Sequence, residues 1–189
     1  MHHTTKLMVV MAIVCGQPSI SGAPPLQVTG GTVRPLASSD NRLSTLTGFT
    51  VDYPKRDWNL LVGAGSSLVV FAHKNRDATV AIERTTIERP LAPNEITEQT
   101  AVLEMEQWLS RRPLASSLAR QLVDVAGARF IVIDFAQSGP QGREIARIYT
   151  LPRGSNWYRV ICTTTQPTFE KYRDTCHRIA LSVTPTPTP

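Results

Sequence analysis

The last third of the chain, residues 157–183, constrains the fold most, because a strand pattern there runs almost directly into a helix pattern. Residues 157–163 alternate, so Tyr158, Val160 and Cys162 share one strand face and Arg159 points to the other. Pro167 suits the first turn of a following helix. The apolar stripe of that helix comprises Phe169, Tyr172, Cys176, Ile179, Ala180 and Val183. Such a stripe must be buried, so we expect the helix to pack on the strand before it.

This packing would bring the two cysteines together. Cys162 lies on the inward face of the strand and Cys176 lies on the buried stripe of the helix. We therefore predict a Cys162–Cys176 disulfide, closing a loop of about 15 residues and stabilising the fold by roughly 3 kcal/mol. Two buried free thiols, each acting as a small hydrophobic side chain, are the alternative.

The middle of the chain switches between strand and helix patterns. Alternation predicts strands over 48–53, 68–72, 78–83, 118–125, 128–136, 143–151 and 157–163. A helix is predicted over 94–110, where Ala101, Met105 and Trp108 share one face. Strands joined by short turns must be antiparallel. The predicted fold class is α+β, an antiparallel β-sheet with one helix inserted midway and another at the end.

The N-terminus has a different composition. Residues 7–15 are continuously apolar, follow one lysine and precede small residues, the order of a secretory signal peptide. Nine residues of helix are too short to cross a hydrocarbon core of about 30 Å. We predict a signal peptide over 1–23, a flexible linker over 24–46, one α+β domain over 47–183 and a disordered Thr/Pro tail over 184–189. Cys15 closes the apolar run, so a lipid anchor at Cys15 is an alternative, although Val14 is larger than lipidation sites favour.

The excess of basic over acidic residues is spread along the chain. The formal charge is +5, and the longest basic runs are the pairs Lys55-Arg56 and Arg111-Arg112. This distribution indicates a mildly basic solvated surface and no nucleic-acid partner. Arg76, Arg84 and Arg89 are the candidates for a basic edge near His73.

The order of these segments resembles the PsbP-like family, named for an extrinsic subunit of the photosystem II oxygen-evolving complex. The resemblance covers roughly 45–184 and rests on Gly48–Pro54 (GFTVDYP) with Trp58 near the start, and on the closing strand and helix. It implies an antiparallel β-sheet flanked by helices in an αβα sandwich, and a binding or assembly role without catalysis. Bacterial secreted members of unknown role share this fold. No segment ties the chain to photosystem II.

Residues that carry chemistry are sparse. No nucleophile elbow or metal-ligand spacing appears, and the glycine-rich stretch 63–67 lacks the lysine of a phosphate-binding loop. His73 and Asp77 read as a polar pair flanking a turn. Three tryptophans are weak candidates for ligand or partner contact, although packing in the core is the ordinary role of such rings: Trp58, Trp108 and Trp157. No cofactor is expected.

The sequence leaves three functional hypotheses. The first is a secreted or periplasmic accessory protein that binds another protein through a sheet face or edge, without catalysis. The second is a small-ligand carrier with a pocket between the sheet and the 94–110 helix, beside Trp108. The third is a hydrolase with an unrecognised site, which requires a perturbed carboxylate or histidine in a cleft. The oligomeric state stays open.

Overall fold

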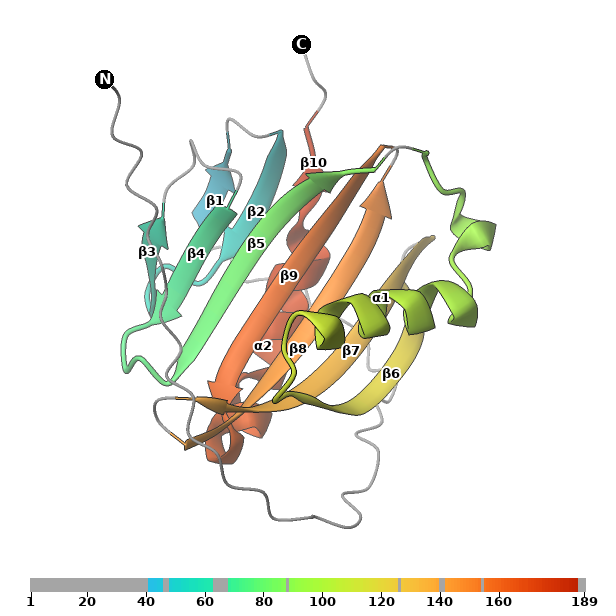
Figure 1. The fold of residues 1–189 in the computed structure, drawn as a ribbon. Coiled ribbons are helices and arrows are strands. Elements are labelled where there is room, and N and C mark those ends of the chain that lie inside the picture. The colour runs from blue at the N-terminus through green and yellow to red at the C-terminus, as the bar shows by residue number, and fades with distance from the viewer. Residues whose placement is uncertain are drawn as a thin grey trace, which may run out of the picture.

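The computed structural model describes residues 41–45, 48–62, 68–87, 89–125, 127–139, 142–153 and 155–186. Within these ranges the chain forms ten strands and two α-helices (Figure 1). The strands are β1 (Asn41–Ser44), β2 (Phe49–Tyr53), β3 (Trp58–Val62), β4 (Leu68–His73), β5 (Ala78–Thr86), β6 (Ser116–Val125), β7 (Ala128–Gly139), β8 (Gly142–Arg153), β9 (Asn156–Thr165) and β10 (Thr184–Pro185). The helices are α1 (Glu98–Ser110) and α2 (Phe169–Ser182). This content confirms the α+β class.

Seven strands form one large antiparallel sheet. Their order is β3-β4-β5-β9-β8-β7-β6. The segment containing α1 carries the chain from β5 to the far edge of the sheet, where β6 starts. The chain then returns strand by strand until β9 pairs with β5. The prediction of antiparallel neighbours joined by short turns is therefore confirmed.

A second sheet, of three strands in the order β1-β2-β10, corrects two predicted boundaries and the expectation of a single sheet. Strand β1 pairs with β2 although 24–46 was predicted as linker, and β10 pairs with β2 although 184–189 was predicted as a disordered tail. Proline is tolerated in β10 because this strand lies at a sheet edge. The pairing continues one residue further, where the Thr186 amide donates to the Gly48 carbonyl at 3.0 Å.

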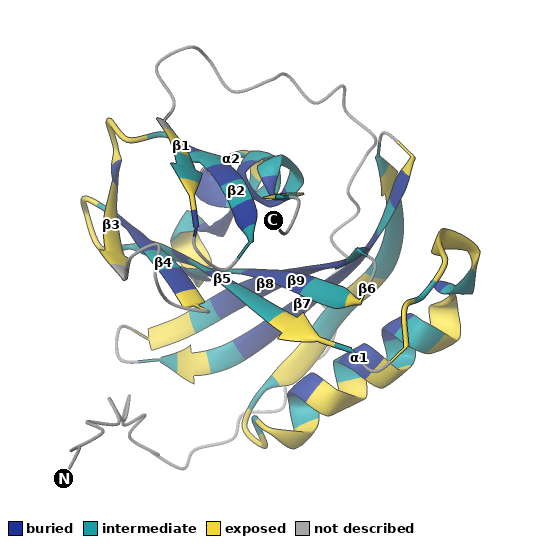
Figure 2. Ribbon diagram, turned by 90° about the horizontal axis from the view of Figure 1, so that it is seen from above, coloured by how far each residue is buried: buried dark blue, intermediate teal, exposed yellow. Residues whose placement is uncertain are grey.

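The two α-helices lie on opposite sides of the large sheet (Figure 2). We call the side that faces α2 and the small sheet the α2 face, and the opposite side the α1 face. Each face has its own buried cluster. The predicted layering of helices around one sheet is therefore modified, because the three-stranded sheet shares the α2 face with helix α2.

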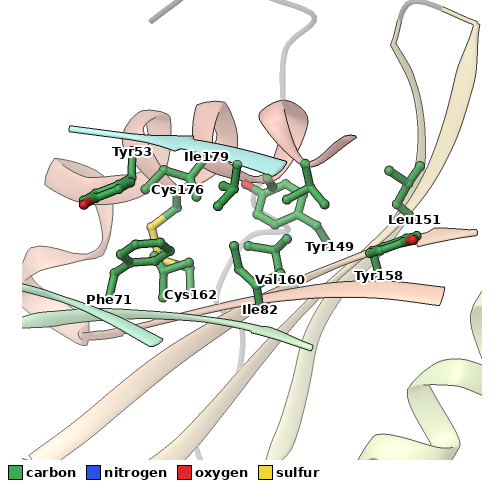
Figure 3. Packing of buried hydrophobic residues seen from close by; sticks show 14 of the residues in the cluster. Tyr53, Phe71, Ile82, Tyr149, Leu151, Tyr158, Val160, Cys162, Cys176 and Ile179 are labelled. Carbon is green, nitrogen blue, oxygen red and sulfur yellow. A yellow bond between two sulfur atoms is a disulfide. The ribbon is translucent and has the colours of Figure 1, made fainter. Parts of the chain in front are cut away.

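The main core lies on the α2 face (Figure 3). The stripe predicted for the last helix is buried there, with Cys176 and Ile179 fully covered. The disulfide between Cys162 of β9 and Cys176 of α2 is present, with the two Cα atoms 6.0 Å apart. The sequence prediction for this pair is confirmed, and the bond joins the last helix to the middle of the sheet.

Both helices begin later than predicted. Pro93–Glu95 forms a separate 3-10 turn, and α1 begins at Glu98 because Thr97 caps it by accepting from the Thr100 amide. A second 3-10 turn, Gln166–Thr168, holds Pro167, and α2 follows from Phe169. Strand β3 was not predicted, because its sequence WNLLV does not alternate between apolar and polar residues. Its pairing with β4 is irregular between Leu60 and Val62.

Some predictions fall outside the described residues. These are the signal peptide over 1–23, lipidation at Cys15, the linker before residue 41, the 63–67 loop and the last three residues of the tail. Among the described residues, neither helix has the length and apolarity needed to span a bilayer.

Candidate functional site

The structure separates the three tryptophans named from the sequence. Trp58 is 2% exposed on the α2 face, where its ring lies edge-on to His73 and Tyr172. Trp108 is buried between α1 and the sheet, and Trp157 packs at the margin of the same cluster on the α1 face. They do not converge on a common site, and packing explains each position.

Helix α1 is fixed to the sheet by a buried carboxylate that the sequence analysis did not single out as structural. Glu104 is 3% exposed, and its Oε1 accepts hydrogen bonds from Arg159 Nε at 2.6 Å, Thr150 Oγ1 at 3.1 Å and Trp108 Nε1 at 3.2 Å. Arg159 Nη2 donates to the other oxygen at 3.1 Å. Glu104 lies three residues after Ala101 and four before Trp108, on the same face of the helix. This spacing was the sequence signal that Glu104 would be buried.

Arg159 connects this carboxylate with the next strand. Its Nη1 donates to Thr85 Oγ1 at 3.2 Å and lies 3.7 Å from Glu83 Oε1. The arginine therefore bridges helix α1, strand β9 and strand β5. The alternation prediction that Arg159 points away from Cys162 is confirmed by these contacts.

Helix α1 covers only part of the α1 face. It packs against β6 and β7, and Figure 1 shows it lying away from β3, β4 and β5. We call the α1 face of β3, β4 and β5, with residues 161–165 of β9, the open half. One row across the strands runs from Val70 through Ala81 and Ile161 to Ile148. The first three are partly exposed and Ile148 is buried, so an apolar row leads from beneath α1 into the open half.

The open half ends at strand β3, an edge of the large sheet. Among the described strands β3 pairs with β4 alone, so one side of its backbone has no strand partner. Three consecutive side chains, Asn59, Leu60 and Leu61, are exposed, and Leu61 is 61% exposed. Figure 2 shows β3 as an exposed strand at the margin of the molecule. Exposed apolar residues on an unpaired edge are a place where another chain can add.

A small hollow lies at one end of the open half. Its volume is about 150 Å³, and Thr79, Thr163, Thr165, Glu144 and Arg76 contribute to its walls. Sites for small organic ligands usually enclose roughly 300–1,000 Å³. The expected ligand pocket beside Trp108 is not found in the described residues there, because the space between α1 and the sheet holds the side chains of Ile131, Ile133, Phe135 and Ile148.

A polar cluster beside the β4–β5 turn joins that turn to α2. Tyr172 Oη donates to Asp77 at 2.8 Å, and His73 Nδ1 lies 3.0 Å from both Asp77 Oδ1 and Tyr172 Oη. Burial opposes the charge on Asp77, but hydrogen bonds from Tyr172 and its own backbone and the charges of Lys171 and His73 lower its pKa. The predicted His73–Asp77 pair is confirmed as a turn-flanking contact. Within the described ranges, no three His, Cys, Asp or Glu side chains gather as metal ligands.

The second buried acid also has a structural role. Asp134 and Arg147 are each 1% exposed on the α2 face, joined by two hydrogen bonds of 2.6 Å. Like Glu104, Asp134 is held by an arginine and is almost fully buried. These buried acids therefore offer no exposed reacting group of the kind that the hydrolase hypothesis requires.

Comparison with known proteins shows the fold. No protein-family model matches the chain. No curated protein sequence matches it either. Among solved structures, cyanobacterial PsbP from Synechocystis sp. PCC 6803 superposes with a TM-score of 0.59 at 15% identity, covering 86% of this chain and 99% of that one. A structure from Bacteroides thetaiotaomicron superposes with a TM-score of 0.54 at 12% identity, covering 79% of this chain and 49% of that one.

The chain therefore has a PsbP-like α+β fold, as the sequence resemblance predicted. At these identities the likeness concerns the fold, which does not by itself decide a function.

Proposed function

We propose that this protein is an exported accessory protein that binds another protein, without catalysis, through the open half of the α1 face and the β3 edge. The observation that carries the proposal is the combination, within the described residues, of an apolar row on a part of the sheet that α1 does not cover with an exposed edge strand that pairs with β4 alone. Monomeric proteins protect such edges because other strands can pair with them.

The shape of this surface favours a macromolecule over a small ligand. The row through Val70, Ala81 and Ile161 lies on a sheet surface, and the hollow beside it is small. A partner strand added to β3 would gain main-chain hydrogen bonds. The apolar row begins one strand further in, at Val70 of β4, so a second element of the same partner would cover it. The two parts of the surface therefore suit one partner protein that pairs with β3 and packs on the row.

We infer the compartment from covalent chemistry and from the leader predicted at the N-terminus. The Cys162–Cys176 disulfide is buried between β9 and α2, and such bonds persist in oxidising environments. A PsbP-like fold is compatible with a binding role. The disulfide and the signal peptide predicted around the apolar run 7–15 both support export.

Site-specific photo-crosslinking tests this proposal. A photoreactive amino acid replaces Leu61 on β3 or, as the control, Leu103, which is 56% exposed on helix α1. We expect an adduct of one defined mass from position 61 and not from position 103. Unlabelled protein should compete for this adduct, whereas unlabelled Leu61→Lys protein should not, because a charge on the edge opposes strand addition. The same adducts at both positions would contradict the proposal.

A further inference from the structure

Two turns that are distant in the sequence meet at one end of the large sheet. One is the β2–β3 turn with Lys55, Arg56 and Asp57, and the other is the β4–β5 turn with Lys74 and Arg76. The Lys74 amide donates to the Asp57 carbonyl at 2.9 Å, and Trp58 pairs with His73 where the two strands adjoin. The turns are therefore held side by side, and we call this end of the molecule the basic end.

The cations of the basic end are exposed and lack acidic partners. Lys55, Arg56, Lys74 and Arg76 form no ion pair with any other described residue. Exposed arginines elsewhere are paired, such as Arg42 with Asp52 at 2.8 Å and Arg89 with Glu95 at 2.7 Å. Unpaired cations keep their field available to an external anion.

The carboxylates nearby offset only part of this charge. Asp77 accepts from Tyr172 and lies 3.6 Å from the amine of Lys171, which adds a fifth cation to the basic end. Five cations therefore face Asp57 and Asp77 in the turns, Glu144, which lines the same hollow as Arg76, and Glu170, which is paired with Arg173 at 2.8 Å. The excess of positive charge is modest, and it lies in the two turns and the first turn of α2.

The basic end has a rigid base. Trp58 is buried beneath it, and Tyr172 binds the β4–β5 turn through Asp77. Arg76 has a φ of 60°, a left-handed conformation that glycine or asparagine adopts more readily, and its amide donates to the His73 carbonyl at 2.8 Å. The turn therefore presents a long cationic side chain at a position where most turns carry a small residue.

The position at which the chain joins the domain bears on what this end can face. Asn41, the first residue of β1, pairs with Tyr53, the residue two places before Lys55. The preceding chain therefore reaches the domain at the basic end. In the sequence, 25 residues separate Asn41 from Cys15, which closes the apolar run over 7–15. A bilayer that held this run, or a lipid on Cys15, would tether the domain through the chain that enters at this end, so the basic end is able to face the bilayer.

We propose that the basic end docks on the anionic lipid headgroups of the bilayer to which the N-terminal segment leads. One acyl chain alone gives only marginal membrane binding, and a basic surface is a second signal that makes the attachment stable. Each lysine or arginine near an anionic surface strengthens binding about fivefold, over a range of about 8 Å at physiological salt. Docking in this way leaves the β3 edge and the open half available to a protein partner.

Binding of the mature protein to lipid vesicles tests the proposal. We use vesicles of phosphatidylcholine containing phosphatidylglycerol, and vesicles of phosphatidylcholine alone, in a sedimentation assay. The test variant is Lys55→Gln/Lys74→Gln. The matched control is Arg89→Gln/Arg153→Gln, which removes the same charge near the opposite end of strands β5 and β8. We expect the test variant to lose about 25-fold in partitioning to anionic vesicles and the control to lose little.

Three results would overturn the proposal. Equal losses for the two variants would show that net charge, and not the basic end, drives binding. The absence of any preference for anionic vesicles would exclude headgroup docking. Saturable binding to an acidic polypeptide, with no vesicle binding, would assign the basic end to an acidic protein partner.

Near-ultraviolet circular dichroism of both variants checks that the fold is retained. The crosslinking from position 61 reports on the proposed function independently.

Discussion

The two faces of the seven-stranded sheet are built differently. The α2 face is covered by a second sheet and by helix α2, which a disulfide attaches covalently to β9. The α1 face is covered by α1 over β6 and β7, and Glu104 fixes that helix through hydrogen bonds. The α2 face therefore maintains the fold, whereas the α1 face leaves part of its surface exposed. The following predictions test that division, starting with the largest effect.

The largest expected effect comes from the buried ion pair of the α2 face. Arg147→Met leaves Asp134 buried and charged without its partner, and should lower the free energy of unfolding by about 3–5 kcal/mol. Urea denaturation measures the change. The double variant Asp134→Leu/Arg147→Met should recover much of the loss, because it removes both charges. A single variant as stable as the wild type would show that the α2 face does not depend on this pair.

The disulfide should have the next largest effect. Cys162→Ala/Cys176→Ala removes the cross-link between residues 14 apart, and should lower the free energy of unfolding by about 3 kcal/mol. Reduction of the wild-type protein should produce a similar shift in the urea midpoint, while leaving the variant unchanged. If reduction has no effect on the wild type, α2 is held by its apolar stripe alone.

A smaller effect is expected from the polar anchor of the α1 face. Glu104→Gln preserves the shape but removes the charge that Arg159 contacts, and should cost about 1–3 kcal/mol. Arg159 retains Glu83 and Thr85 as partners, so the loss is smaller than for Arg147→Met. Hydrogen exchange should accelerate in α1 and stay unchanged in α2. Equal acceleration in both helices would show that the two faces are not independent.

The smallest effect at neutral pH concerns Tyr149, whose contribution changes only in alkaline solution. Burial raises the pKa of Tyr149 on the α2 face to about 12, whereas an exposed tyrosine ionises near 10. The unfolded chain therefore loses this proton first, and the stabilisation present below pH 10 declines by about 1.4 kcal/mol per pH unit up to about pH 12. Tyr149→Phe should reduce the slope of stability against pH in this range. If the slope is unchanged in Tyr149→Phe, other ionisable groups cause the loss of stability at alkaline pH.

Much of the fold was predictable because its signals are local. Alternation predicted strands where β4, β5, β7, β8 and β9 occur, and the helical stripe with its cysteine placed α2 against β9. These patterns hold because a strand or helix with one apolar face must bury that face. The β3 strand and the two short strands β1 and β10 were missed, since each is short and gains its stability from pairing.

The candidate site was less predictable. The tryptophans named from the sequence proved to be core or core-edge residues, and the surface features arose from residues that looked ordinary. Arg84 and Arg89 were expected to form a basic edge with Arg76. Arg84 lies near the far end of β5 and Arg89 comes after that end, whereas Arg76 precedes the strand. The basic residues near Arg76 are instead Lys74 and those of the β2–β3 turn. Proximity of this kind depends on which strands pair, which a local pattern does not show.

By itself, the sequence determined the α+β class, the helix–strand pair at its end and the cysteine bond, because periodicity and side-chain polarity act over a few residues. Tertiary structure alone decided that Glu104 would be buried by an arginine from another strand, that α1 would leave half of one sheet face uncovered, and that two basic turns would meet. Those outcomes depend on contacts between residues distant in the chain, whose free energy appears only when the strands are assembled.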